Sequence, residues 1–257
     1  MLGLPEDVRA CVLDLEGVLT DSAALHAWAW CEVFDDFLLR SSHRTGWHFI
    51  PFDTVADYRS YLDGRPRLEG VHAFLRSRGI QLPEGCIDDS PEAETANGLA
   101  NRKGATLANR LRERGVNESV GARRYLEAAH RAGVTCAAIS ASASTSRVLE
   151  LSGLAALIDV RIDAETMRSD CLRSLPAPDV LLAVCRRLDV LPAEAATLTC
   201  SPAGVAAGRS AGLVVIGIGA AEHAELLAGF GAEHVVPSLR TLLDPRLVDA
   251  GDGLDGP

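Results

Sequence analysis

The chain has 257 residues, of which 47% are hydrophobic and 23% charged, and its 35 acidic side chains against 25 Lys and Arg give a net charge of −10. That length corresponds to about 1.7 domains, so we expect one large α/β domain or a core with an inserted module. The acidic balance argues against a nucleic-acid surface, which needs a basic face, and the apolar content excludes a wholly disordered chain. No apolar run reaches the roughly 18 residues of a membrane helix, and the start of the chain lacks a signal-peptide pattern, so we expect a cytoplasmic protein.

The N-terminal part predicts one buried strand followed by helices. The strand covers residues 10–15 and leads into a turn that contains Gly17. An amphipathic helix is predicted over 23–39, with apolar side chains at helical spacing. Further helices are predicted over 68–78 and 95–114, separated by segments rich in Gly, Pro, Ser and Asp that are typical of loops.

From about residue 118 onward, short apolar segments alternate with amphipathic ones. This alternation predicts a doubly wound parallel sheet with helices on both faces, because strands buried on both faces are apolar throughout. The predicted strands lie within 134–140, 157–163, 195–200 and 213–219, and the predicted helices within 121–133, 142–153, 177–190 and 201–212.

The fold class is therefore α/β, with a mostly helical cap inserted after the first strand. We expect the core to comprise residues 1–24 and 118–245 and the cap to comprise 25–117. The cap is expected over the carboxyl ends of the strands, where such sheets bind ligands. The Gly- and Asp-rich residues 246–257 are expected to form a flexible tail.

One motif follows the first strand directly. The residues DLEGVLTDS at 14–22 resemble the DxDGVLxDS signature of the haloacid dehalogenase superfamily, in its β-phosphoglucomutase-like branch. Further matches in the same order are His26 with Trp30, the segment 61–67, Ser140, the segment 176–179 and the segment 201–205. The resemblance implies a Rossmann-like core with a cap, and a Mg²⁺-dependent phosphatase or phosphomutase that acts on a sugar phosphate.

The resemblance also implies roles for individual residues. Asp14 corresponds to the nucleophile that attacks phosphorus, Glu16 to the group that shuttles the proton, and both to ligands of Mg²⁺. Ser140 corresponds to the hydroxyl that binds phosphoryl oxygens. Candidate substrate-binding residues in the cap are His26, Arg65, Arg67 and Lys103, the last being the only lysine of the chain.

The chain departs from the family pattern at the supporting positions. Glu16 stands where the family has Asp, Leu175 where it has Lys, and Thr199-Cys200 where it has a Glu-Asp pair. Deleting one preorganised donor typically costs about 10²–10³ in rate, so these losses together remove on the order of 10⁴–10⁶. Arg173 is a candidate replacement for the lysine, and Asp163, Glu165 and Asp170, in a predicted loop, are candidate replacement acids.

Three hypotheses follow. The first is a protein with a degraded active site that binds a sugar phosphate or a partner, with little or no Mg²⁺-dependent phosphoryl transfer, in association or fusion with a carbohydrate-active domain. The second is a working Mg²⁺-dependent phosphatase or phosphomutase in which Asp14 is the nucleophile and Arg173, a loop acid or Lys103 supplies the lost functions. The third is altered chemistry without a metal, with Glu16 as general base.

Overall fold

The computed structural model describes residues 2–46 and 48–243, which form two units. The core unit contains the residues up to Asp21 and those from Val116 onward, and the cap unit is Ser22–Gly115. The structure thus divides after Asp21 and Gly115, where we expected division after residues 24 and 117. The expected tail, 246–257, lies outside the described residues.

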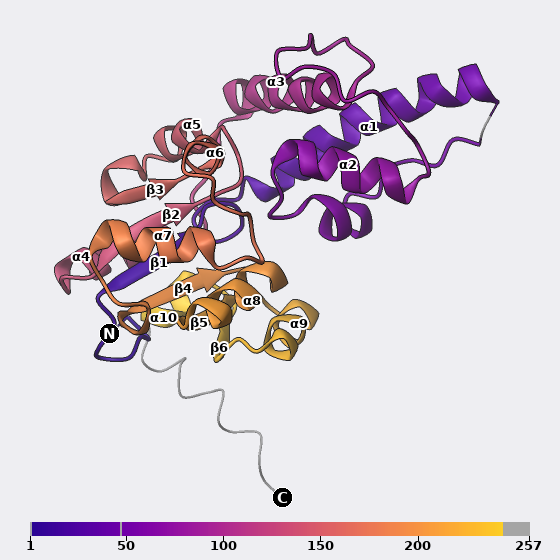
Figure 1. Cartoon of the computed structure of the whole chain (residues 1–257). Helices are drawn as coiled ribbons and strands as arrows, with labels where there is room; N and C mark the ends of the chain where they lie inside the picture. The colour runs from indigo at the N-terminus through magenta and orange to yellow at the C-terminus, as the bar shows by residue number, and fades with distance from the viewer. Residues whose placement is uncertain (1, 47, 244–257) are drawn as a thin grey trace, which may run out of the picture. The chain divides into compact units, whose positions relative to one another are not determined.

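A parallel sheet forms the centre of the core unit (Figure 1). Across the described residues its strand order is β3-β2-β1-β4-β5-β6, so β1 lies in the middle between β2 and β4. This confirms the expected doubly wound α/β class. The strands are β1 Ala10–Asp14, β2 Thr135–Ile139, β3 Val160–Ile162, β4 Ala195–Thr199, β5 Val214–Ile218 and β6 His234–Val236.

Helices cover both faces of this sheet, which explains why the strands are apolar throughout. Ala10 and Val12 of β1 are buried in one cluster with side chains of α7 and α8. Cys11 faces the other way, toward Tyr125 of α4, at 3.9 Å from its hydroxyl oxygen. The α-helices in the described part of the core unit are α4 Ala122–Arg131, α5 Thr145–Leu151, α6 Ala164–Ser169, α7 Asp179–Leu188, α8 Pro202–Ala211, α9 Glu222–Phe230 and α10 Leu239–Leu243.

The helix α6 corrects one expectation, because we had predicted a loop there. Asp163 caps this helix by accepting a hydrogen bond from the backbone of Thr166 at 2.9 Å, and it also forms an ion pair with Arg161 at 2.8 Å. Burial opposes ionisation of Asp163, but these contacts hold the pKa of its carboxyl below the ordinary value. Asp163 is therefore engaged in capping and pairing, which does not favour it as a substitute metal ligand.

The cap unit is helical, as its sequence predicts. It contains α1 Ala23–Thr45, the short π-helix η1 Tyr58–Leu62, α2 Arg67–Ser77 and α3 Ala96–Arg114. The first helix is longer than the expected 23–39, and it ends at Gly46, whose φ of 74° allows its N–H to reach the carbonyl of Ser42. Packed aromatic rings form the centre of the unit, and the tilted pair Phe34 and Phe74 is only 4.0 Å apart between ring centroids.

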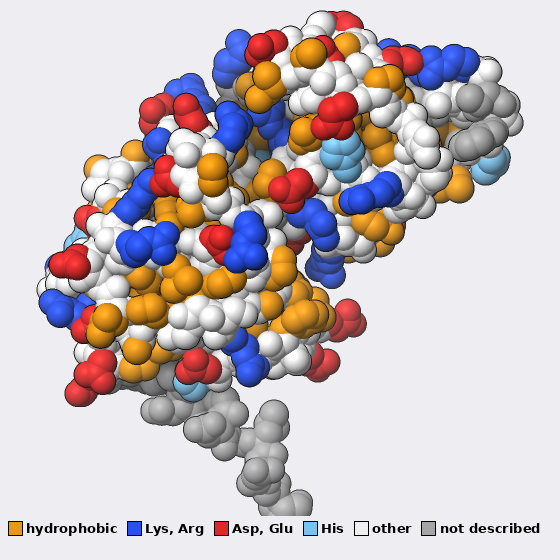
Figure 2. All heavy atoms as spheres, in the orientation of Figure 1, with side chains coloured by type: hydrophobic (Ala, Val, Ile, Leu, Met, Phe, Trp, Pro, Cys, Tyr) orange, Lys and Arg blue, Asp and Glu red, His pale blue; other side chains and the backbone are white. Residues whose placement is uncertain are grey.

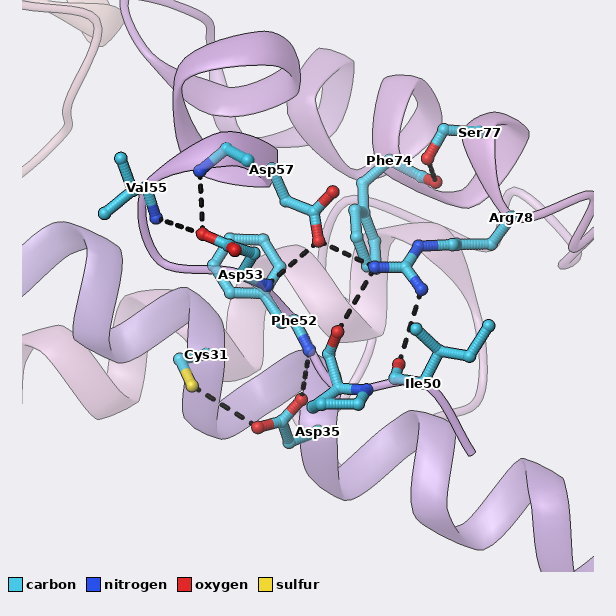
Figure 3. A network of polar contacts seen from close by, with 12 residues as sticks. Cys31, Asp35, Ile50, Phe52, Asp53, Val55, Asp57, Phe74, Ser77 and Arg78 are labelled. Carbon is cyan, nitrogen blue, oxygen red and sulfur yellow. Dashed lines mark hydrogen bonds and ion pairs between the residues drawn. The ribbon is translucent and has the colours of Figure 1, made fainter. Parts of the chain in front are cut away.

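A network of polar contacts ties the segment before η1 to the helices (Figure 3). Asp35 of α1 accepts a hydrogen bond from the backbone N–H of Phe52 at 2.7 Å. Arg78, at the end of α2, donates to Asp57 at 2.6 Å and to the carbonyl of Ile50 at 3.4 Å. These contacts attach residues 50–57 to α1 and to the end of α2.

None of the helices in the described part of the chain is long and apolar enough to cross a membrane. On the face drawn in Figure 2, acidic and basic side chains are interspersed over the surface.

Candidate active site

The strand order brings two predicted site residues, Asp14 and Ser140, to one edge of the core unit, together with Thr199. In the parallel register Asp14 of β1 lies beside Ile139 of β2, and Leu13 lies beside Leu198 of β4. Residues that follow these strands must therefore meet at the carboxyl edge of the sheet. Asp14, Ser140 and Thr199 are located there.

Two neutral donors hold the carboxylate of Asp14. The hydroxyl of Thr199 donates to its Oδ2 at 2.6 Å, and the backbone N–H of Cys200 donates to the same oxygen at 3.3 Å. Thr199 is fully buried and lies against Gly204 of α8, where any side chain would collide with the threonine hydroxyl. The packing of β4 against α8 thus holds the Thr199 hydroxyl in place, and this hydroxyl in turn holds the Asp14 carboxylate.

Glu16 is held in a similar way. Its Oε1 accepts a hydrogen bond from the hydroxyl of Ser140 at 3.0 Å, and its backbone carbonyl accepts one from the Cys200 thiol at 3.3 Å. The turn after β1 passes close to this thiol, since a Cβ at Gly17 would lie 2.7 Å from the sulfur, and Gly17 has a φ of 81°. A glycine is required at that point, because only glycine combines this φ with so close an approach.

Leu175 stands where the family pattern has a lysine, and its candidate substitute, Arg173, is paired with a carboxylate. Leu175 packs against the apolar cluster beneath α7. Arg173, 75% exposed, forms an ion pair with Asp179 at 2.9 Å, and this hydrogen bond lowers the pKa of the Asp179 carboxyl and raises that of the guanidinium. The structure therefore places Arg173 at the start of α7, paired with a carboxylate.

The Asp14 carboxylate and the backbone carbonyl of Glu16 are the oxygens at this edge that would hold Mg²⁺. Mg²⁺ prefers an octahedral shell of oxygen atoms, usually with one or two carboxylates. In the described part of the chain no cluster of three or more His, Cys, Asp or Glu side chains is arranged to hold a metal. The oxygens nearest to such a role, on Asp14 and the Glu16 carbonyl, accept hydrogen bonds from Thr199 and the thiol of Cys200.

The cap unit brings together most of its predicted substrate-binding residues. Lys103, only 2% exposed, donates from Nζ to Nδ1 of His26 at 3.1 Å, and it lies 5.3 Å from the centre of the Trp30 ring. Burial lowers the pKa of His26 well below its usual value, and the charges of Lys103 and Arg67 lower it further. His26 is thus held as a neutral acceptor for the lysine.

Arg67 and Arg65 differ in their placement. Arg67 donates to the carbonyl of Ala100 at 3.1 Å, and its guanidinium lies over Gly104 of α3, where any side chain would collide with it. Arg65 is exposed on the surface. The basic cluster of the cap unit therefore consists of His26, Lys103 and Arg67.

Two features of the core site were not predicted. We recognised Thr199-Cys200 only as a departure from the family pattern, whereas both residues hold the Asp14–Glu16 turn. The ring of His223, from the segment after β5, also reaches this edge, with Nε2 at 2.7 Å from the Cys200 carbonyl. The available signal was the position of His223 just beyond a predicted strand of a parallel sheet.

Comparisons with known proteins agree with this architecture. A family model for haloacid dehalogenase-like hydrolases matches residues 8–212. A protein from Mycobacterium bovis named as a β-phosphoglucomutase is 46% identical over 247 residues, which are 95% of this chain and 94% of that protein. A Mycobacterium tuberculosis protein named as a glycosyl hydrolase is 33% identical over 90% of this chain but only 17% of its own length.

Solved structures show the same fold. A β-phosphoglucomutase from Clostridium difficile superposes with a TM-score of 0.72 at 24% identity, covering 95% of this chain and 96% of the other. The topology described above is therefore that of known phosphoglucomutase structures.

Proposed function

The chain belongs to the haloacid dehalogenase-like hydrolase family, in its β-phosphoglucomutase-like branch, and from that premise we propose that it binds a sugar phosphate but transfers the phosphoryl group slowly or not at all. The single observation that carries this proposal is the set of neutral donors around Asp14 and Glu16. Thr199 and Cys200 contact these two residues, and they stand at the positions where the family pattern has a Glu-Asp pair.

Electrostatics gives the physical reason. A phosphoryl group carries negative charge throughout transfer, so the protein assists mainly by neutralising that charge and fixing geometry. Two unit charges of like sign 4 Å apart near a protein surface repel by about 4 kcal/mol. Asp14 and Glu16 oppose a phosphate dianion in this way, while Leu175 offers no compensating cation.

Glu16 adds a second obstacle to transfer. Its carboxylate already accepts the hydrogen bond of Ser140, the hydroxyl that the family uses for phosphoryl oxygens. A phosphate must displace Glu16 before Ser140 can donate to it. Until that happens, the hydroxyl of Ser140 remains bonded to an acid of the protein itself.

The test is a turnover assay on the wild type and Asp14→Asn, with p-nitrophenyl phosphate and a panel of hexose phosphates, with and without Mg²⁺. We expect turnover at or near that of Asp14→Asn, together with a rise in the melting temperature at millimolar hexose phosphate. Robust Mg²⁺-dependent turnover that disappears in Asp14→Asn would overturn the proposal. No stabilisation by any hexose phosphate would overturn the binding part of it.

A second candidate is a working sugar-phosphate phosphatase or phosphomutase with Asp14 as nucleophile. The relative that favours it is the Mycobacterium bovis protein named as a β-phosphoglucomutase, which matches 95% of this chain. In such an enzyme Mg²⁺ would supply the neutralising charge, and Lys103 or Arg173 would have to replace the lost lysine. The assay above distinguishes the two candidates.

We also propose that this protein functions in association or fusion with a carbohydrate-active domain. The supporting observation is the Mycobacterium tuberculosis relative, of which the match covers only 17% and which is named as a glycosyl hydrolase. Co-purification of this chain with a glycoside-processing enzyme from its own host tests the idea. A chain that purifies without any such enzyme contradicts it.

A further inference from the structure

Every polar group of Cys200 makes a contact in the core unit. Its backbone N–H donates to Asp14 and its thiol donates to the carbonyl of Glu16. Its own carbonyl accepts from Nε2 of His223 at 2.7 Å, the shortest of the three contacts. Cys200 therefore links the Asp14–Glu16 turn to a side chain that comes from the segment after β5.

The contact fixes the tautomer of His223. A backbone carbonyl only accepts hydrogen bonds, so Nε2 must carry the hydrogen. The other ring nitrogen, Nδ1, is buried and has no hydrogen-bond partner among the described residues. Within the described structure the hydrogen bonding of the ring is thus directed at the Cys200 carbonyl.

The backbone around His223 is shaped to seat the ring. A Cβ at Gly219 would lie 2.6 Å from Cδ2 of the imidazole, so the ring occupies space that only glycine leaves open. Ala221 has a φ of 49° and a ψ of −133°, a conformation that residues with a side chain rarely adopt. A strained residue and a glycine on the same short segment both serve the placement of this side chain.

We infer that His223 is a positioning residue of the Asp14 site. Its ring holds the Cys200 carbonyl, and the N–H and thiol of Cys200 in turn hold Asp14 and the Glu16 carbonyl. His223 thereby sets the geometry of the turn that carries both carboxylates. The effect on ligand affinity rests on the proposed function, whereas the effect on Cys200 does not.

The test compares His223→Ala with the conservative variant His223→Gln, whose side-chain amide can donate to the same carbonyl. A third variant, Gly219→Ala, displaces the ring without removing it, and His234→Ala, at an exposed histidine of β6, is the matched control. The first readout is the rate at which iodoacetamide alkylates Cys200, measured by peptide mass spectrometry. The fully buried Cys11 reports global unfolding in the same experiment.

We expect His223→Ala and Gly219→Ala to raise the alkylation rate of Cys200 by roughly threefold to tenfold, the range for loss of one hydrogen bond. Cys11 should keep its wild-type rate, and His223→Gln and His234→Ala should leave Cys200 near the wild-type rate. Equal Cys200 rates in all variants overturn the inference. Parallel increases at Cys200 and Cys11 overturn it as well, because they mean that His223 serves only global stability.

The second readout is the affinity for glucose 1-phosphate, measured by thermal shift. We expect His223→Ala to weaken it by a similar factor and His223→Gln to restore it. If the wild type does not bind this probe, the proposed function fails for it, while the alkylation readout still decides the role of His223. If the wild type binds and His223→Ala binds equally well, the positioning role is contradicted.

Discussion

The core site is built on acidic side chains and the cluster of the cap unit on basic ones, yet in both regions these side chains contact uncharged partners. In the core unit, two acidic residues are held by uncharged donors, namely the hydroxyls of Thr199 and Ser140 and the thiol of Cys200. In the cap unit, a buried lysine is held by an uncharged imidazole and lies near an indole ring.

The two regions also differ in which charged residues of the family pattern they keep. The cap unit keeps the basic residues that the family resemblance implies, and it buries Lys103 to 2% exposure. Burying a cation is expensive unless it is hydrogen-bonded, so that arrangement is specifically supported by His26. The core unit keeps Asp14 and an acid at position 16 but has Leu175 and Cys200 where the family pattern has charged side chains, which is the basis of the proposal of slow transfer or none.

The largest expected effect comes from restoring charge in the core unit. The double variant Leu175→Lys/Cys200→Asp adds a cation and a carboxylate at the positions where the family pattern has them. Because each such group typically contributes about 10²–10³ in rate, we expect Mg²⁺-dependent hydrolysis of p-nitrophenyl phosphate to rise at least by that factor. Steady-state turnover with and without Mg²⁺ measures it.

The control is Leu175→Met/Cys200→Ser, which changes the same positions without adding charge. It should stay at the wild-type rate. Equal gains in both double variants would mean that packing, not charge, limits the wild-type site.

A matched pair of glycine substitutions compares how rigidly each region is built. Gly204→Ala pushes against the buried hydroxyl of Thr199, which is fixed on a central strand, whereas Gly104→Ala pushes against the end of the flexible Arg67 side chain. We expect Gly204→Ala to lower the free energy of unfolding by about 1–3 kcal/mol, as overpacking does. Gly104→Ala should range from neutral to a gain of up to about 1 kcal/mol, because alanine favours a helix.

Urea unfolding of both variants and the wild type supplies the numbers. A cost at Gly104 equal to that at Gly204 would show that the two regions are equally rigid, contrary to this comparison.

The smallest effect concerns pH and the cap unit. The folded-state pKa of His26 is lowered well below 6.5, first by burial and then by Lys103 and Arg67. Below pH 6.5 the unfolded chain therefore binds a proton that the folded chain does not, and the free energy of unfolding falls as the pH falls. The slope attributable to His26 reaches at most about 1.4 kcal/mol per pH unit.

Urea midpoints of the wild type and His26→Gln at about pH 5.5 and pH 7.5 isolate this contribution. The wild type should lose more stability on acidification than the variant does. Parallel pH profiles for the two proteins would show that His26 is not buried as a neutral base.

The sequence predicted those features of the fold that depend on the pattern of neighbouring residues. Apolar strands alternating with amphipathic segments predicted the parallel sheet, and a parallel sheet necessarily brings the residues after β1, β2 and β4 to one edge. Asp14 and Ser140 were predicted from this and from the motif. The end of α1 was missed because the polar residues 40–45 continue the helix until Gly46 stops it.

The hydrogen-bond partners of the site residues could not be predicted from the sequence. Thr199 and Asp14 are 185 positions apart, and nothing local to either residue shows that a hydroxyl donates to that carboxylate. His223 escaped notice because its role depends on a ring orientation that Gly219 and Ala221 make available only in the folded chain. Strand ends can be read from a sequence, whereas the pairing of side chains across them depends on packing.

The central proposal is that uncharged donors, and no metal ion, hold the acids of the core site. Calorimetric titration of Mg²⁺ into the wild type, Asp14→Asn and Cys200→Asp tests it most directly. We predict no saturable binding to the wild type at millimolar Mg²⁺ and clear binding to Cys200→Asp. Saturable binding to the wild type that is lost in Asp14→Asn would contradict the account.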